Sequence, residues 1–190
     1  MAIKDEFLRA IKDNISRDGI GDLTKWLIDT DFFTAPASTR YHGAHEGGLA
    51  EHSMAVYRRL LQFASVYDKN NAERTWSQET LAIVALFHDL CKIGCYKVEM
   101  RWRKDQYNRW EQYPTYKFSE DFPFGGHGSK SLYLVQNFIN LTPEEAVAIN
   151  CHMGQWDSTT YSNPTAAYEV NHLAWLLHVA DEAADFIDKI

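Results

Sequence analysis

Residues 77–94 have the sequence SQETLAIVALFHDLCKIG, which contains the most apolar helical segment of the chain. Ser77 is a good N-cap for a helix, and Gly94 is placed to end one. Because apolar side chains cover every side of this segment, we expect a helix over residues 77–93 at the centre of the fold. Near its end stand His88 and Asp89, an imidazole and a carboxylate in a buried setting.

Helical periodicity also dominates on both sides of this segment. Apolar side chains recur every three to four residues in 7–15, 22–29, 49–67, 132–141 and 164–190, whereas residues 32–42 are typical of a loop. Thr142-Pro143-Glu144-Glu145 combines a capping box with proline at the first helical position, and Asn163-Pro164 is a second start signal. These patterns predict a mainly α-helical fold, with one domain over residues 1–190.

Residues 96–118 differ from the rest because they are rich in aromatic residues, valine and threonine. Two strand-like runs flank Asp105-Gln106-Tyr107-Asn108, which predicts a β-hairpin inserted into the helical domain. The segment carries six basic side chains against three acidic ones. Arg101 and Arg103, beside aromatic rings, could hold phosphates while the rings stack on a nucleobase. The alternative is a ribbon whose aromatics pack across the strands and whose charges face water.

Composition excludes several classes of protein. With 190 residues, 45% of them hydrophobic, the chain is too rich in core-forming residues to be disordered. Its net charge of -7 argues against coating nucleic acid or an anionic membrane with the whole surface. The longest apolar run, residues 81–87, is far shorter than the ~20 residues of a membrane span. The N-terminus lacks the pattern of a secretory signal, so we expect a cytoplasmic protein.

The three cysteines are Cys91, Cys95 and Cys151, without Cys-x-x-Cys spacing. This number and spacing make a disulfide framework or a zinc knuckle a poor interpretation. We therefore expect all three to be ordinary thiols of the core.

Histidines carry the strongest functional signal. Five of the eight lie on or beside apolar helical segments, where an unpaired imidazole is costly to bury: His52, His88, His127, His152 and His178. Neighbouring helical positions such as His88 and Asp89 diverge by about 100°, so both can serve one ion only if it lies between them. His52 and Asp181 are the best candidates for further ligands from other helices. Such a nitrogen and oxygen set suits manganese, iron, nickel or zinc.

Three motifs resemble the His, His-Asp, Asp signature of the HD-domain superfamily of metal-dependent phosphohydrolases. They are Glu51-His52-Ser53, His88-Asp89-Leu90-Cys91-Lys92 and Val179-Ala180-Asp181. The segments GGLAEH (47–52), GHG (126–128) and CHMG (151–154) are similar to a subset of the superfamily that includes a bacterial exoribonuclease. The chain departs from the pattern at Cys91, where glycine is usual, and at Met153, which replaces a second histidine.

The resemblance implies an HD-domain helical bundle with a β-hairpin insertion at residues 96–118, and a site for one or two divalent ions (Mn, Fe, Ni, Zn or Mg). The implied ligands are His52, His88, Asp89 and Asp181 for the first metal, and Asp89, His127 and His152 for the second. Two metals about 3.5 to 4 Å apart would clamp a phosphate ester and share the attacking hydroxide. Beside Asp89 as a catalytic group, Lys92 would offer charge to the phosphoryl oxygens, with Lys130 as a weaker candidate.

The predicted function is hydrolysis of a phosphomonoester or phosphodiester, from a nucleotide or a short single-stranded oligonucleotide, with no membrane partner. His42 and His45 precede a Gly-Gly turn and could approach this substrate, although solvated loop histidines are common. His178 could support the site from behind or simply belong to the core. Two alternatives stay open, a di-iron oxygenase of the same type and a module that senses a nucleotide without turnover.

Overall fold

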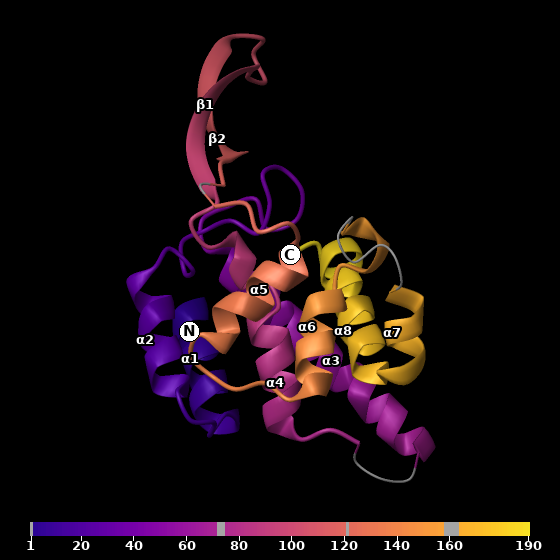
Figure 1. The fold of residues 1–190 in the computed structure, drawn as a ribbon. Coiled ribbons are helices and arrows are strands. Elements are labelled where there is room, and N and C mark those ends of the chain that lie inside the picture. The colour runs from indigo at the N-terminus through magenta and orange to yellow at the C-terminus, as the bar shows by residue number, and fades with distance from the viewer. Residues whose placement is uncertain (1, 72–74, 121, 158–163) are drawn as a thin grey trace.

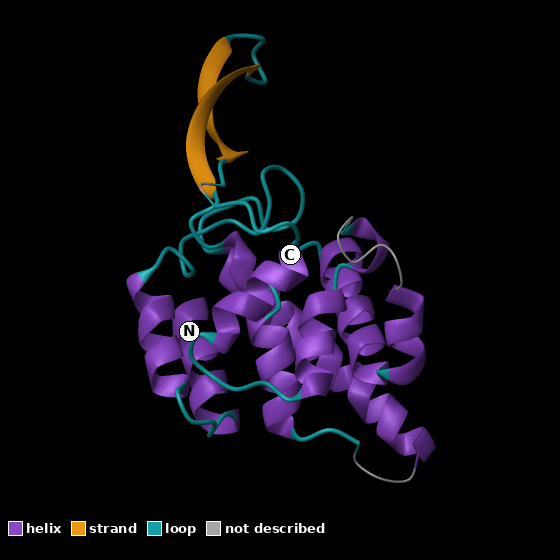
Figure 2. Ribbon diagram, viewed as in Figure 1, coloured by secondary structure: helices purple, strands orange, loops and turns teal. Residues whose placement is uncertain are grey.

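The computed structural model describes residues 2–71, 75–120, 122–157 and 164–190. It is mainly helical, with one two-stranded antiparallel sheet, which confirms the predicted mainly α class (Figure 2). The helices are α1 (Ile3–Asn14), α2 (Ile20–Asp29), α3 (Gly48–Asn71), α4 (Gln78–Phe87), α5 (His127–Gln136), α6 (Pro143–Cys151), α7 (Pro164–Val170) and α8 (His172–Ala183). Short turns η1 (Leu90–Lys92), η2 (Gly154–Trp156) and η3 (Ala184–Asp188) complete the helical part, as Figure 1 shows.

Helix α4 lies at the centre of the bundle and packs against α1, α3 and α6. Every residue from Leu81 to Phe87 is at most 3% exposed. Ser77 caps the helix, since its hydroxyl accepts a hydrogen bond from the Thr80 amide at 3.0 Å. The prediction of one helix to residue 93 was wrong, because Asp89 leaves the helical region at φ −110° and ψ 21°. The resulting turn changes how His88 and Asp89 point relative to each other.

The predicted C-terminal helix over residues 164–190 is divided into α7, α8 and the π-helical turn η3. Asn171 separates the first two, because its side-chain oxygen accepts a hydrogen bond from the Ala174 amide and so caps α8. Its amide nitrogen donates to the Glu144 carbonyl of α6 at 2.9 Å. The predicted start residue Asn163 lies outside the described residues. The capped α8 packs against α3 and α6, and so brings Asp181 into the middle of the bundle.

The predicted hairpin is confirmed, with strand β1 (Tyr96–Lys104) paired to β2 (Trp110–Phe118). Its register runs from Tyr96 opposite Phe118 to Lys104 opposite Trp110, and the ribbon projects away from the helices (Figure 1). Asp105 stabilises the turn by accepting hydrogen bonds from the Tyr107 and Arg109 amides. The hairpin thus forms a separate arm attached to the helical bundle.

A buried ion pair joins the N-terminal helices to α6 and yields a test of the fold. Arg17 Nη1 lies 2.5 Å from Oε2 of Glu145, whose side chain is fully buried. We expect Arg17→Met to lower the free energy of unfolding by about 3 kcal/mol, because it leaves a buried carboxylate without its cation. Urea titration measures this change. The matched variant Arg58→Met, which breaks an exposed pair with Glu6, should change stability by less than about 1 kcal/mol. Equal losses of stability in the two variants would contradict the view that the buried Arg17–Glu145 pair stabilises the fold.

Candidate metal centre

The four side chains predicted for a first metal lie together in the buried interior. They come from α3 (His52), the turn after α4 (His88 and Asp89) and α8 (Asp181). His52 Nε2 is 3.0 Å from Asp181 Oδ1 and 3.4 Å from His88 Nε2. Asp89 Oδ2 lies 3.6 Å from Nε2 of each of these histidines. The fold therefore brings two imidazole nitrogens and the Asp181 carboxylate together, with the Asp89 carboxylate beside both histidines.

Main-chain oxygens determine which ring nitrogen of each histidine faces these carboxylates. His52 Nδ1 lies 3.0 Å from the main-chain oxygen of Ile190, and His88 Nδ1 lies 2.7 Å from the Ala85 carbonyl, and both oxygens are acceptors. Since these oxygens can only accept a hydrogen bond, each Nδ1 must carry a proton. In the neutral rings the lone pairs of both Nε2 atoms then point into the group, 3.4 Å apart. Either a proton on Nε2 that is donated to Asp181 or a metal cation between the rings removes the repulsion of these lone pairs.

The spacing of these four side chains fits a divalent metal. Adjacent ligand atoms about 2.0 to 2.2 Å from an ion in tetrahedral or octahedral geometry lie about 2.8 to 3.6 Å from one another. The distances here, from 3.0 to 3.6 Å, lie within that range. Imidazole and carboxylate ligands suit manganese, iron, nickel and zinc.

A second group of possible ligands adjoins the first and shares Asp89. His152 Nε2 lies 3.6 Å from Asp89 Oδ1, while its Nδ1 lies 2.7 Å from the Ile149 carbonyl. Within the described part of the chain, this buried Nε2 has no hydrogen-bond partner. Because the two oxygens of Asp89 face different histidines, its carboxylate is placed to bridge two ions.

Cys91, which was not among the predicted ligands, lies in a further group with Asp89 and His127. Its Sγ lies 3.7 Å from His127 Nδ1 and 3.8 Å from Asp89 Oδ1. These three side chains could share a metal ion. Cys91, Cys95 and Cys151 are all free and buried, which agrees with the prediction that they are thiols of the core. The sequence did contain a sign that Cys91 lies near the ligands, because Cys91 occupies the position where the motif usually has glycine.

Charges around Asp89 and Asp181 keep both carboxylates ionised. Burial alone raises the pKa of Asp89, but Lys92 Nζ at 2.6 Å and the nearby imidazoles hold it well below its usual value. Burial acts on Asp181 in the same direction, and hydrogen bonds from His52 and His88 lower its pKa. For His88, burial lowers the pKa, yet the two carboxylates outweigh burial and raise it. A metal entering this site would therefore displace protons from imidazole.

Lys92 lies against Asp89 and is 9% exposed. Burial lowers its pKa, but Asp89 reverses the effect and the net shift is upward. The ammonium therefore stays charged and is held by the carboxylate. Its predicted contact with phosphoryl oxygens stays a prediction.

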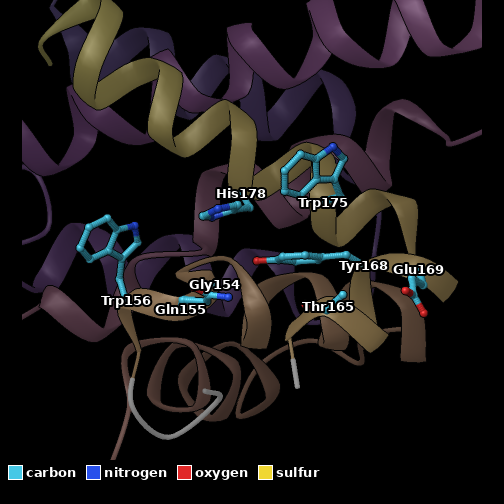
Figure 3. A pocket seen from close by; sticks show the side chains of 8 residues that line it. All are labelled: Gly154, Gln155, Trp156, Thr165, Tyr168, Glu169, Trp175 and His178. Atoms are coloured by element: carbon cyan, nitrogen blue, oxygen red, sulfur yellow. The ribbon is translucent and has the colours of Figure 1, made fainter. Parts of the chain in front are cut away.

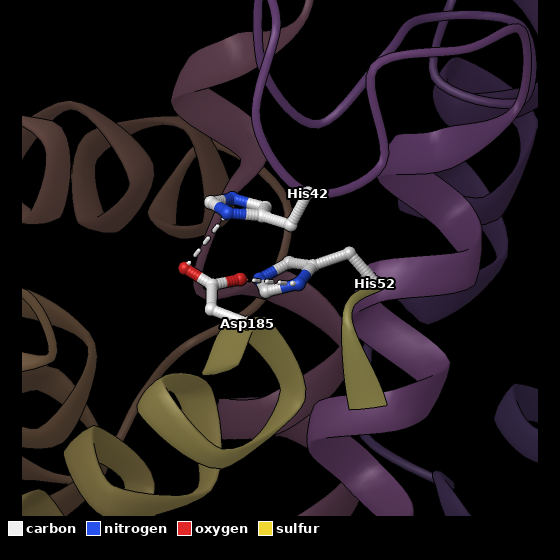
Figure 4. A group of neighbouring side chains, drawn as sticks. All are labelled: His42, His52 and Asp185. Atoms are coloured by element: carbon white, nitrogen blue, oxygen red, sulfur yellow. Dashed lines mark ion pairs between the residues drawn. The ribbon is translucent and has the colours of Figure 1, made fainter. Parts of the chain in front are cut away.

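Asp185 and His42 form a third arrangement, next to His52 (Figure 4). Asp185 lies 3.1 Å from His42 Nδ1 through Oδ2 and 3.3 Å from His52 Nδ1 through Oδ1. The His42 ring stacks on that of His52, with centroids 5.4 Å apart. Burial raises the pKa of Asp185 to about 8. Asp185 was not among the predicted ligands, although it follows Asp181 by one helical turn.

The other predicted binding residues lie outside these groups. His45 is exposed, with Nε2 3.4 Å from Glu51. Lys130 pairs with Glu120 at 2.6 Å. Arg101 and Arg103 lie on the hairpin, where they pair with Glu99 at 2.8 Å and with Glu111 at 2.7 Å. Contact of these residues with substrate stays a prediction.

Two hollows adjoin the centre and share Trp156 in their walls. One has a volume of about 370 Å³ and is lined by Lys92, His127 and Lys130 among others. The other has a volume of about 850 Å³ and reaches Asp181. The candidate ligands can therefore be approached from two sides.

A third hollow, of about 650 Å³, has His178 in its wall (Figure 3). Tyr168 and Trp175 line it, and the Tyr168 ring stacks on that of His178. His178 Nδ1 lies 2.7 Å from the carbonyl of His152. His178 thus supports the backbone behind a candidate ligand and is not itself one of the candidates.

No family model, curated protein or solved structure matches this chain. Within the described residues, no helix combines the length and the apolar character needed to cross a membrane.

Proposed function

We propose that this protein is a metal-dependent phosphohydrolase of the HD type, which cleaves a phosphomonoester or phosphodiester of a nucleotide or short oligonucleotide. One observation carries the proposal. Three buried histidines, His52, His88 and His152, direct Nε2 toward the carboxylate of Asp89 while main-chain oxygens occupy Nδ1. Such fixed tautomers are typical of metal ligands.

The residues divide into two ligand sets. His52, His88, Asp89 and Asp181 would hold one divalent ion. The predicted ligands of a second ion fall into two groups that share Asp89, one with His88 and His152 and the other with Cys91 and His127. Bound metal would lower the pKa of a coordinated water and polarise a phosphoryl oxygen.

Side chains around these ligands would hold the ligands in position and balance the negative charge of the site and of a bound phosphate. Lys92 holds Asp89 in place through the contact at 2.6 Å and balances its charge in the interior. Lys130 lines the same hollow as His127 and can meet a phosphoryl oxygen if it leaves Glu120. His42 fixes the rim of the larger hollow through its contact with Asp185.

The test is a hydrolysis assay on the purified full chain. The substrates are a panel of nucleotides, short oligonucleotides and a generic aryl phosphate, with added manganese. We expect phosphate or nucleotide release that stops when a chelator is added and returns with metal. Inactivity on the whole panel would overturn the proposal.

Elemental analysis and oxygen consumption distinguish the competing functions. Oxygen uptake with a mixed-valent iron signal and no phosphate release would favour a di-iron oxygenase. Tight nucleotide binding without turnover would favour a sensing module.

A further inference from the structure

We propose that the hairpin arm, residues 96–118, binds a second copy of this chain. Two copies exchange arms reciprocally, and each arm lies on helices α7 and α8 of the other copy. The arm projects away from its own helices, as Figure 1 shows, and each of its strands has nine residues. Strands of this length span roughly 30 Å, which is enough to reach across a neighbouring helical bundle. The contact forms whether or not the metal centre hydrolyses a phosphate ester.

One face of the arm is apolar and exposed. Side chains alternate between the two faces along each strand, and residues directly opposite each other share a face. Apart from Lys104 and Gln112, the side chains of one face are apolar or aromatic: Tyr96, Val98, Met100, Trp102, Trp110, Pro114, Tyr116 and Phe118. Val98, Trp102 and Trp110 of this apolar face are 66%, 61% and 64% exposed.

The opposite face of the arm is polar and already has partners of its own. Arg101 pairs there with Glu99 at 2.8 Å, and Arg103 pairs with Glu111 at 2.7 Å. An antiparallel sheet with one polar and one apolar face normally packs the apolar face on a core. A two-stranded hairpin without such packing is only marginally stable in water. The exposed apolar face of the arm therefore points to cover from another molecule.

Charge identifies that molecule as a second copy. The arm has six basic against three acidic side chains, a balance of +3, whereas residues 119–190 have two basic against ten acidic ones, a balance of -8. Without the candidate metal ligand Asp181, the balance of residues 119–190 is still -7. Opposite charges favour an arm that lies on this C-terminal part of the other copy. Two arms packed on each other would instead bring like charges together.

The same part of the chain presents a matching hollow, the space of about 650 Å³ beside α7 and α8 (Figure 3). Trp156 and Trp175 line it and are 73% and 47% exposed. The exposed Glu169 also lines it, and none of its described lining residues is a lysine or arginine. Indole rings and a carboxylate suit the cations at the far end of the arm, Lys104 and Arg109. Tryptophan and arginine, which the arm supplies, are common anchors of protein interfaces.

The area available favours an exchange over a pairing of two arms. Five large side chains of the apolar face are between 45% and 66% exposed: Val98, Met100, Trp102, Trp110 and Phe118. At roughly 100 Å² for each, they offer about 500 Å² per arm. Two arms packed only on each other would bury about 1,000 Å², whereas two arms on two helical bundles bury about 2,000 Å². Stable interfaces bury about 1,200 to 2,000 Å², so the exchange reaches the required size.

The first experiment removes the apolar anchors of the arm. Sedimentation velocity on the full chain at micromolar concentrations measures the Kd of the dimer. We expect this Kd to rise at least about 100-fold in Trp102→Ser/Trp110→Ser, because buried tryptophans dominate the binding energy of an interface. Both side chains are exposed in one copy, so the Tm of the helical bundle should stay unchanged. The control Ile28→Ser/Val66→Ser removes two exposed apolar side chains from α2 and α3 and should stay within about twofold.

A second variant tests the receiving surface. Glu169→Lys/Trp175→Ser alters the hollow and leaves the arm intact, and we expect its dimer to weaken by a similar factor. A mixture of this variant with the arm variant should recover part of the dimer, because one intact arm then meets one intact hollow. Circular dichroism confirms that both variants keep their helices.

Every other result overturns the exchange. A parent chain that stays monomeric, or an arm variant that dimerises as well as the parent, removes the arm as a docking element. Weakening by the arm variant alone would show that two arms pack on each other and not on α7 and α8. If both variants weaken the dimer but their mixture recovers none of it, the arm and the hollow are not partners.

Discussion

Asp89→Asn is expected to lower kcat/KM for the best phosphate ester by at least about 1,000-fold and to remove bound metal. Asp89 faces both ligand groups, with Oδ2 toward His52 and His88 and Oδ1 toward His152. Asparagine has nearly the same shape as aspartate but lacks the negative charge with which a carboxylate can bridge two metal ions. Metal ions contribute several kcal/mol of transition-state stabilisation, and about 4 kcal/mol corresponds to 1,000-fold in rate.

Two measurements separate this effect from unfolding. Elemental analysis gives metal equivalents per chain, and circular dichroism gives the stability. Asp89→Asn leaves the Lys92 ammonium buried without its partner, so some stability will be lost. Asp89→Asn/Lys92→Met removes both charges and should recover stability without recovering metal. The exposed Asp13→Asn should keep both metal and activity. Retention of two metal equivalents by Asp89→Asn would refute the bridging role.

Metal is expected to stabilise the folded chain by about 4 kcal/mol when its free concentration is about 1,000 times its Kd. The reason is that the ligands converge only after folding, since His52, His88 and Asp181 lie far apart in the sequence. For a chain of this size, that free energy corresponds to a rise in Tm of about 10 °C. Thermal denaturation with chelator and with manganese measures the difference.

A pair of histidine variants identifies the source of this stabilisation. His88→Ala should abolish most of the rise in Tm, because it removes one of two nitrogens at the first site. His172→Gln should preserve it, because His172 pairs with the Tyr67 hydroxyl at 2.6 Å and is not a candidate ligand. Full stabilisation of His88→Ala by manganese would show that the ion binds elsewhere.

Local patterns were enough to predict several elements. The cap at Ser77, the capping box at Thr142 and the hairpin at residues 96–118 each depend on contacts between near neighbours in the chain. Apolar periodicity likewise identified α4 as the central helix, because burial of its seven apolar residues requires cover on every side. His88-Asp89 at the end of that helix then indicated where ligands should gather.

The sequence by itself determined the helical class, the hairpin and the histidines and carboxylates available to a metal. Only the tertiary structure decided how these side chains meet. The two oxygens of Asp89, at the backbone turn, face different histidines, and the main-chain oxygen of Ile190, 138 positions away, accepts a hydrogen bond from His52 Nδ1. Cys91 and Asp185 lie beside the centre for the same physical reason. Their positions depend on contacts between residues distant in sequence, which no local periodicity or capping signal encodes.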